Sequence, residues 1–347
     1  MVGLLSLDDV DHLLTETAIR TPAVRLARDG EVLAESRYTR SGASLAGRPL
    51  TGLVDTRRLL REFDDGATVV LQGLHRYWPP LRDLVAELEL ELGHTCQANA
   101  YLTPPGSQGF AVHSDTHDVF VFQTHGHKQW EVHTGGRAEE VLLEPGVAMY
   151  LPTGTPHAAR AQDTVSLHVT LGIDQLTWRQ VAERSVVDLL DEVPDTHVPA
   201  GWLDRPDRLA TGLRDHLDRV ADGVRRLDAE QIARQRAELF LTTRGTRMAG
   251  GLRDVIAVRD LSDSTRLVRR PGHPCVLVDT DTETHTGLRV LLGDRHLDVP
   301  ARLRPALEVV RDRSALTPGD LAGHLDPESR LVLCRRLVRE GLLRVEG

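Results

Sequence analysis

The sequence predicts an α+β fold in three successive parts, because three different patterns follow one another along its 347 residues. Within residues 1–173, apolar runs of four to eight residues recur from about 95 onward at intervals of roughly ten, which is typical of antiparallel sheets in a sandwich or small barrel. Residues 174–265 repeat apolar residues at spacings of three and four, which predicts helices. Residues 266–347 combine strand-like runs with two or three helical stretches, which suggests a winged-helix-like module.

The first ninety residues are expected to alternate helix and strand. In SLDDVDHLL, Ser6 is suited to cap a helix whose first turn is acidic. DTRRLLREFDDG predicts a second helix closed by Gly66, and PPLRDLVAELELELG predicts a third that ends at Gly93. ATVVLQGL, between them, is rich in branched apolar residues and predicts a strand. The strands expected after residue 94 are TCQANAYL, DVFVFQTH, KQWEVH, EEVLL, VAMYL and TVSLHVTLGI.

The middle segment is expected to need a partner. Its helical stretches LTWRQVAERSVVDLLDEV, DRLATGLRDHLDRVADGVRRL and DAEQIARQRAELFL provide too little core to fold alone, so they should pack on another part or form a homodimer. After residue 266, CVLVDT and LRVLLGD predict strands. The helices expected there are ARLRPALEVVRDR, TPGDLAGHL and PESRLVLCRRLVREGLL.

Composition narrows the class of protein. Three dispersed cysteines (Cys96, Cys275 and Cys334) exclude a disulfide framework and a cysteine zinc site, and fit a reducing cytoplasm. The N-terminus has no basic region of the kind that begins a signal peptide, and no apolar run reaches the length of a membrane span, so a cytoplasmic protein without membrane contact is expected. A net charge of −9, with 14 Arg against 12 acidic residues in 266–347, argues against nucleic-acid binding.

The candidate metal ligands lie in a tract rich in histidine. Seven of the sixteen histidines fall between residues 113 and 168. On a strand, His113 and Asp115 would project to the same side, and two histidines with one carboxylate form the facial triad of non-haem Fe(II) oxygenases. His157 is a candidate third ligand, because PTGTP is a tight connection that would present it at the start of the next strand. His168, which alternation places on a polar strand side, competes for that role. The other His-x-Asp pairs are at 216/218, 296/298 and 324/326, in less suitable surroundings.

The chain contains a single lysine, Lys128, among 42 basic residues. Lys128 and Trp130 are two residues apart on an expected strand and therefore share one face. The alternatives for Lys128 are a solvated hairpin lysine and a buried cation that binds an anionic ligand.

These motifs resemble a known family. NAYLTPPGSQGFAVHSDTHDVFVFQTHGHKQWEVH, followed by LEPGVAMYLPTGTPHAARAQDTVSLHVTLGI, is similar to the JmjC-type ribosomal oxygenases, which are Fe(II)- and 2-oxoglutarate-dependent protein hydroxylases of the cupin superfamily. The combined pattern is H-x-D-x-x-D-V-F, then G-x-K-x-W, P-x-G-x-x-H and S-x-H-V-T. The resemblance implies a double-stranded β-helix over 1–173, a helical dimerisation region over 174–265 and a winged-helix-like domain over 266–347.

The resemblance also implies residue roles. His113, Asp115 and His157 would be the catalytic iron ligands, and O2 would react at the same metal. Lys128 would bind the far carboxylate of 2-oxoglutarate, and Asn99 would help to hold this co-substrate.

Four further positions are expected near the co-substrate or the substrate. His168 and Trp130 would line the co-substrate pocket, and Tyr101 would line the substrate pocket. Asp118 has two open alternatives, a substrate contact or the cap of a turn. The histidines expected at the hairpins or the rim are His117, His125, His127 and His133.

The expected reaction is hydroxylation of a side-chain carbon in a polypeptide, with the β-carbon of a histidyl residue as the specific hypothesis. The substrate would be a ribosomal protein or a ribosomally made peptide, and an acidic protein surface would suit a basic partner. Two alternatives stay open. One is N-methyl demethylation by the same iron chemistry, and the other is a non-catalytic metal-binding cupin with a regulatory winged helix.

Overall fold

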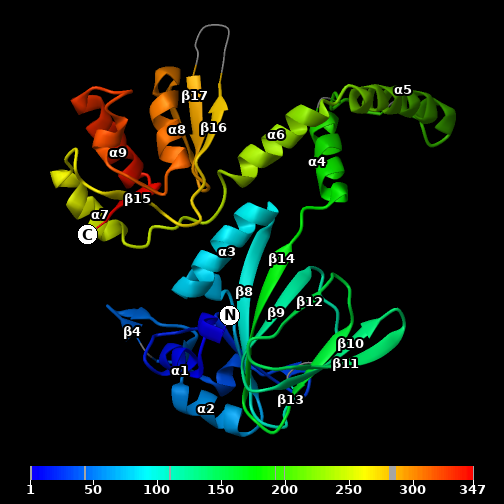
Figure 1. Ribbon diagram of the computed structural model, residues 1–347. Helices are drawn as coiled ribbons and strands as arrows, with labels where there is room; N and C mark the ends of the chain where they lie inside the picture. Colours follow the sequence, from blue (N-terminus) through cyan, green and yellow to red (C-terminus); the bar gives the residue numbers. More distant parts are fainter. Residues whose placement is uncertain are drawn as a thin grey trace. The chain divides into compact units, whose positions relative to one another are not determined.

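The computed structural model describes residues 2–42, 44–108, 111–191, 193–198, 200–280 and 287–346. The chain divides into two compact units, Met1–Gln175 and Leu176–Gly347 (Figure 1). This division falls close to residue 173, where the sequence predicts that the sheet-rich part ends.

The N-terminal unit is built on two antiparallel sheets. The larger has seven strands in the order β12-β9-β14-β8-β7-β1-β2, and the smaller has the order β11-β10-β13. The strands of the larger sheet are β1 (Val24–Arg28), β2 (Glu31–Val32), β7 (Thr68–Leu71), β8 (Thr95–Thr103), β9 (Asp118–His125), β12 (Ala148–Leu151) and β14 (Ser166–Asp174). Those of the smaller sheet are β10 (Lys128–Thr134), β11 (Arg137–Leu143) and β13 (His157–Ala161). Two ribbons pair β3 (Thr39–Arg40) with β6 (Leu53–Val54) and β4 (Ser44–Leu45) with β5 (Arg48–Pro49).

Three helices in this unit begin and end close to where the sequence predicts. They are α1 (Leu7–Thr15), α2 (Thr56–Asp64) and α3 (Pro79–Leu92). Ser6 accepts a hydrogen bond from the backbone of Asp9, whose carboxylate accepts one from Ser6 in return, which is a capping box. Gly93 ends α3 in the left-handed region that favours glycine. Short 3₁₀ turns lie at Val2–Leu4, Glu35–Arg37 and Leu74–Arg76.

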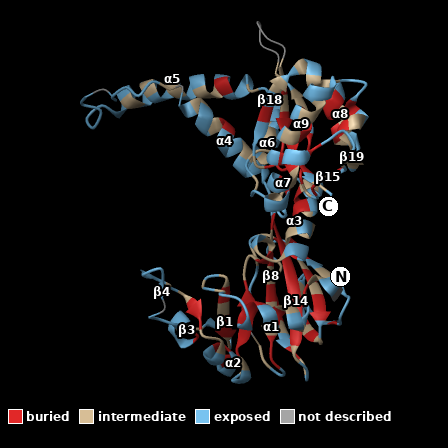
Figure 2. Cartoon of the chain, turned by 90° about the vertical axis from the view of Figure 1, so that its left-hand side faces the viewer, coloured by how far each residue is buried: buried red, intermediate tan, exposed pale blue. Residues whose placement is uncertain are grey.

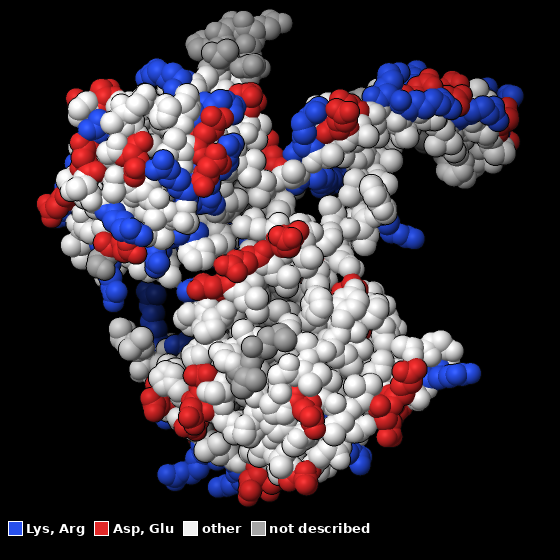
Figure 3. All heavy atoms as spheres, viewed as in Figure 1, with Lys and Arg blue, Asp and Glu red and all other residues white. Residues whose placement is uncertain are grey.

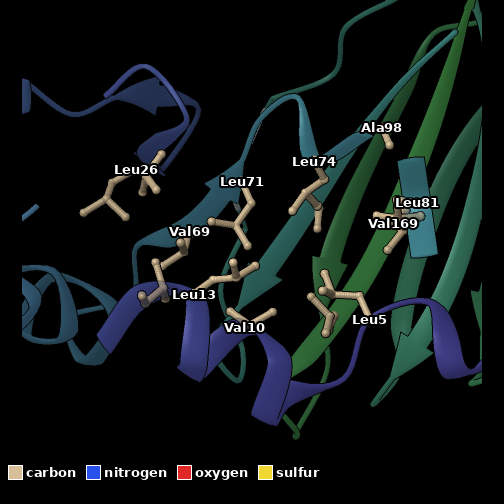
Figure 4. Packing of buried hydrophobic residues seen from close by; sticks show 14 of the residues in the cluster. Leu5, Val10, Leu13, Leu26, Val69, Leu71, Leu74, Leu81, Ala98 and Val169 are labelled. Carbon is tan, nitrogen blue, oxygen red and sulfur yellow. The ribbon is translucent and has the colours of Figure 1, made fainter. Parts of the chain in front are cut away.

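The main core lies between these helices and one face of the larger sheet. Leu13 of α1 and Leu81 of α3 belong to the same buried cluster as Val69, Leu71 and Val169 of the sheet (Figure 4). Figure 2 shows buried residues concentrated along β8 and β14, the long central strands. Strand side chains alternate between the two faces of a sheet. The helices cover one face of the larger sheet, and its other face is directed toward the smaller sheet.

Replacement of Leu81 with alanine should destabilise the N-terminal unit by about 2–5 kcal/mol, because the cavity left in a close-packed core adds to the lost apolar burial. Leu81 is fully buried in α3. Leu92→Ala is the matched control, since Leu92 lies at the end of the same helix with 40% of its surface exposed. Urea unfolding followed by circular dichroism measures both changes, and equal effects would contradict this assignment of the core.

The C-terminal unit contains six helices and two small sheets among its described residues. The helices are α4 (Trp178–Leu190), α5 (Pro206–Arg225), α6 (Ala229–Phe240), α7 (Gly251–Ala257), α8 (Arg304–Asp312) and α9 (Pro327–Arg339). The sheets have the orders β19-β15-β20 and β16-β17-β18. Their strands are β15 (Leu267–Arg269), β16 (Val276–Asp279), β17 (Gly287–Leu291), β18 (His296–Pro300), β19 (Ala315–Leu316) and β20 (Leu343–Val345). Two further 3₁₀ turns are Val258–Asp260 and Ala301–Leu303.

One predicted helix of this unit is wrong. TPGDLAGHL forms only a 3₁₀ turn, Pro318–Leu321, which opens with a capping box between Thr317 and Asp320. Gly319 and Gly323 weaken a longer helix. A Cβ at Gly319 would also lie 3.0 Å from the Asp263 carbonyl, so the chain approaches this turn closely at a glycine.

The helices α4, α5 and α6 bury very little of their own surface. Ser185 is buried in α4 and Gly223 in α5, and no described residue of α6 is buried. Figure 3 shows basic and acidic side chains crowded along α5. This agrees with the prediction that the middle segment has too little core to stand alone. No helix in the described ranges has the length and apolar character that would let it cross a membrane.

Candidate metal and co-substrate site

The N-terminal unit encloses a cavity of about 740 Å³. Its walls come from the uncovered face of the larger sheet, from the smaller sheet and from the segment before β9. Every residue that the sequence places at the site, except Asp118, lines it. These are Asn99, Tyr101, His113, Asp115, Lys128, Trp130, His157 and His168.

Three of the lining residues form a candidate metal centre. One ligand atom each from His113, Asp115 and His157 lies within 4.8 Å of the other two. The Nε2 atom of His157 is 3.7 Å from a carboxylate oxygen of Asp115. Two imidazoles and one carboxylate are the ligand set of a non-haem iron site with open coordination positions. His168 is not part of this cluster.

Backbone pairing brings these ligands together from two separate segments. His113 and His157 form an antiparallel bridge in which each backbone N–H donates to the other residue's carbonyl, at 3.0 and 2.8 Å. His157 begins β13, as the sequence predicts. The expectation of a strand through His113 and Asp115 is wrong, because His113 makes only this isolated bridge. The Asp115 carbonyl instead accepts a hydrogen bond from Gly154, which fixes its segment to the turn before β13.

Each histidine of the cluster has one ring nitrogen engaged by the backbone. Nδ1 of His113 lies 2.9 Å from the Ala111 carbonyl, and Nδ1 of His157 lies 2.9 Å from the Thr155 carbonyl. A carbonyl can only accept, so each Nδ1 carries the proton and each Nε2 offers its lone pair to a metal. Burial lowers the pKa of His157, which favours the neutral, metal-binding form.

Lys128 lines the same cavity at the start of β10, where it pairs with Ala161, whereas His157 pairs with Val132 four residues further along β10. Its side chain is buried, and its Nζ donates to Thr103 Oγ1 at 2.9 Å and lies 3.5 Å from His168 Nδ1. Within the described ranges, no carboxylate forms an ion pair with Lys128, and burial lowers its pKa to about 7. A buried ammonium of this kind fits an anionic ligand, such as the far carboxylate of a dicarboxylate chelated to the metal.

Three aromatic rings connect the lysine with the metal cluster. The ring of His168 stacks on that of Tyr101 at 4.8 Å and 4°, and meets Trp130 edge-on at 5.3 Å. Trp130 also lies 5.9 Å from His157, so it contacts rings on both sides. Burial is the main cause that lowers the pKa of His168, with the charge of Lys128 second, and the ring is therefore neutral.

Asn99 is held on β8 beside the cavity. Its Oδ1 accepts a hydrogen bond from the Gly73 backbone at 3.0 Å, which directs the amide nitrogen away from that turn. Gly73 has a left-handed backbone, φ +65°, which glycine adopts most readily.

Asp118 does not line the cavity and has a dense set of contacts elsewhere. Its carboxylate accepts hydrogen bonds from the backbone and hydroxyl of Thr153 at 2.8 and 2.6 Å, and from Gln175 at 2.7 Å. Tyr150 donates a further one. These contacts favour the turn-capping alternative over a substrate contact.

Sequence reasoning missed three residues of the site. Thr103, the hydrogen-bond partner of Lys128, and Arg25 on β1 both lie on or near the cavity wall because of strand register. Register between distant strands leaves no local sequence signal. His117, expected at a hairpin or rim, lines the cavity and lies against Gly172, where a Cβ would come within 2.6 Å of its ring.

Comparisons with known proteins agree with this geometry. Residues 80–181 match the JmjC domain family. The protein named bifunctional lysine-specific demethylase and histidyl-hydroxylase NO66 of Branchiostoma floridae is 39% identical over 126 residues, 36% of this chain and 21% of that protein. Ribosomal oxygenase 1 of Rattus norvegicus is 30% identical over 204 residues, 52% of this chain and 32% of that protein. The chain thus spans between about a fifth and a third of the length of these relatives.

A solved structure shows the same fold over the whole chain. The ribosomal oxygenase YcfD of Escherichia coli aligns with 100% of this chain and 92% of its own, with a TM-score of 0.54 and 18% identity. The same protein has been solved in complex with cobalt and 2-oxoglutarate, and that structure aligns with a TM-score of 0.52 at 19% identity over the same shares of the two chains. The N-terminal unit therefore has the mixed helix and sheet architecture of the JmjC cupin type. Residues 80–181 therefore carry a match to the JmjC domain, and the chain is similar to proteins named NO66 and ribosomal oxygenase over part of their length.

Proposed function

We propose that the protein is an Fe(II)- and 2-oxoglutarate-dependent oxygenase that hydroxylates a side-chain carbon of a polypeptide. The observation that carries this proposal is that a two-histidine, one-carboxylate cluster and a buried lysine line one cavity. When bound, iron would activate O2, the oxidant, with 2-oxoglutarate as the co-substrate that is oxidised to succinate and CO2, and the protein supplies position and shelter.

The roles of the side chains follow from their contacts. His113, Asp115 and His157 hold the iron, with their ring orientations fixed by backbone carbonyls. Lys128 binds the far carboxylate of 2-oxoglutarate while Thr103 orients its ammonium group. Trp130, His168 and Asn99 line the co-substrate position, and Tyr101 lies toward the substrate. Leu151, Val119, Val121 and Ala159 provide an apolar lining that keeps water from the metal.

The finer assignment is the β-carbon of a histidyl residue. Two similar proteins support a ribosomal protein or ribosomally made peptide as the substrate. NO66 is named as a histidyl-hydroxylase and demethylase, and the other is named ribosomal oxygenase 1. The name of NO66 also includes a lysine-specific demethylase, so N-methyl demethylation is the second candidate. The two reactions differ in product, because a hydroxylated residue keeps the oxygen atom whereas demethylation releases formaldehyde.

Incubation with ribosomal proteins, Fe(II), 2-oxoglutarate and O2 tests this proposal. We expect succinate formation and a mass gain of one oxygen atom on one polypeptide, located on a histidyl residue by tandem mass spectrometry. Formaldehyde release together with loss of a methyl group would replace hydroxylation with demethylation. The absence of succinate with every polypeptide would favour the non-catalytic cupin.

Within the same proposal, the C-terminal unit serves to assemble two copies of the chain. We infer a homodimer through α4–α6 and a winged-helix-like module in residues 266–347 that does not read nucleic acid. Trp178 at the start of α4 is 89% exposed, and Leu213 and Leu217 form an exposed apolar stripe one turn apart on α5. Exposed apolar side chains at helical spacing are typical of a covered interface.

Leu217→Glu should shift the protein from dimer to monomer, since it places a carboxylate in the apolar contact. Arg219→Glu, on the same helix, is the matched control because Arg219 is exposed and charged already. Size-exclusion chromatography with light scattering measures the mass of each. A monomeric wild-type protein, or a dimeric Leu217→Glu variant, would contradict this interface.

A further inference from the structure

The cavity carries an arginine, Arg25, to which the metal and co-substrate assignments give no role. We propose that Arg25 determines substrate specificity by donating hydrogen bonds to an acceptor side chain and by excluding side chains that carry a positive charge. The substrate residue then has an imidazole, amide or carboxylate group, and guanidinium and ammonium side chains are rejected. This inference rests on the proposed function, because it names the substrate class of the same site.

Strand register places Arg25 in a row with the residues that surround the co-substrate position. Arg25 pairs with Val70 on β7, and Val70 pairs with Tyr101 on β8. Tyr101 pairs in turn with His168 on β14. Cross-strand partners project from the same face of a sheet, so this row points toward the cavity. Val70 is short, which lets the longer side chain of Arg25 extend over it.

The hydroxyl of Tyr101 relates Arg25 to the metal cluster. Burial raises the pKa of Tyr101, the charge of Arg25 lowers it and the charge of Asp115 raises it. Hydrogen bonding from the Thr170 and Arg25 side chains lowers the same pKa further. The Arg25 side chain is therefore within hydrogen-bonding range of the Tyr101 hydroxyl, whose pKa also responds to the charge of the Asp115 carboxylate. Arg25 and the metal cluster also line one cavity, so a substrate side chain presented to the cluster enters the space that Arg25 lines.

The charges on the cavity wall determine which side chains can enter. Arg25, Arg76 and Lys128 are its cationic lining residues, and Asp115 is the only carboxylate among the described residues that line it. With Asp115 bound to the metal and Lys128 bound to the co-substrate, no lining carboxylate is left to pair with an arginyl or lysyl substrate. A guanidinium or ammonium has no acceptor to offer Arg25, and burial of unpaired like charges is strongly unfavourable. An imidazole, amide or carboxylate accepts hydrogen bonds and avoids this cost.

The net charge of −9 does not oppose this selection. Exposed charges are screened over about 8 Å at physiological ionic strength, so the acidic surface acts on the approach of a polypeptide. Figure 3 shows acidic and basic groups interspersed on the face that it draws. The half-buried Arg25 acts on the one residue that enters the cavity. A basic polypeptide can therefore be attracted while a non-cationic residue within it is selected.

Three fragments test this selection: the N-acetyl amides of histidine, asparagine and arginine. The full-length protein is loaded with Mn(II) in place of iron and with 2-oxoglutarate, and relaxation of fragment protons by Mn(II) reports binding close to the metal. Relaxation of the 2-oxoglutarate protons in the same samples tests the co-substrate site separately. We expect histidine or asparagine fragments to bind at least about 10-fold more tightly than the arginine fragment.

Two variants connect the selection to Arg25. Arg25→Glu should reverse it, so that the arginine fragment binds best, and Arg25→Gln should abolish it while keeping a neutral side chain that can still form hydrogen bonds. Arg57→Glu is the matched control, because Arg57 is exposed on α2 outside the cavity. Circular dichroism confirms that each variant is folded, and Arg25→Gln carries the test if Arg25→Glu does not fold.

The outcomes separate the two proposals. Unrelaxed 2-oxoglutarate protons would overturn the proposed function and this inference with it. Relaxed 2-oxoglutarate protons with an equal response to all fragments, a lack of any response included, would overturn only the role of Arg25. Tighter binding of the arginine fragment than of the other two to the wild-type protein would also overturn only the role of Arg25.

Discussion

Asp115→Ala is expected to weaken iron binding by at least about 100-fold and to abolish 2-oxoglutarate turnover, because it removes the one anionic ligand of the cluster. The Asp115 carboxylate lies 3.7 Å from His157 Nε2, and both histidines already present their Nε2 lone pairs. Two neutral imidazoles then remain to hold a divalent cation. Isothermal titration with Mn(II) measures the affinity, and succinate formation measures turnover.

Asp163→Ala is the control for this change. Asp163 is an exposed aspartate in the turn between β13 and β14, so its removal changes the net charge equally without touching the cluster. Iron affinity in Asp115→Ala equal to that of the wild type would show that the metal binds elsewhere. Loss of affinity in both variants would mean that overall charge, and not coordination, controls binding.

Lys128→Ala is expected to raise the Kd of 2-oxoglutarate by about 10- to 100-fold, the effect of losing one charge-assisted hydrogen bond in a buried site. Metal binding without 2-oxoglutarate should not change, because Lys128 lies apart from the metal cluster, beside Thr103 and His168. Lys128→Met keeps most of the side-chain length without the charge. Its Kd for 2-oxoglutarate should equal that of Lys128→Ala if the charge of Lys128 determines the affinity. Fluorescence or calorimetric titration of the metal-loaded protein gives each Kd. An unchanged Kd would contradict the carboxylate assignment.

The affinity of the wild type for 2-oxoglutarate should also depend on pH. Burial lowers the pKa of Lys128 to about 7, so the ammonium of the free protein loses its proton as the pH rises above this value. Binding of the carboxylate requires the charged form and therefore takes up a proton. We expect a constant Kd below pH 7 and an increase of up to about tenfold per pH unit above it. Lys128→Met should show no such increase.

Local patterns account for most of the elements that the sequence predicts correctly. The helices at Leu7–Thr15 and Pro79–Leu92 follow from a capping serine and a terminal glycine, which act within a few residues. The start of β13 at His157 follows from the tight turn before it. The wrong helix at 317–325 has the same origin, since a good capping box at Thr317 says nothing about the close contact at Gly319.

The sequence by itself determined the candidate ligands and predicted three successive parts, because motif spacing and hydrophobic period are properties of neighbouring residues. The structure divides the chain into two compact units. It could not choose between His157 and His168 from the residues alone; the structure places His157 in the cluster and His168 beside Lys128. That choice depends on a bridge between residues 113 and 157 and on register across β1, β7, β8 and β14. Such long-range pairing is set by packing of the whole unit, so only the tertiary structure decided which side chains share the cavity, and it alone placed Arg25 there.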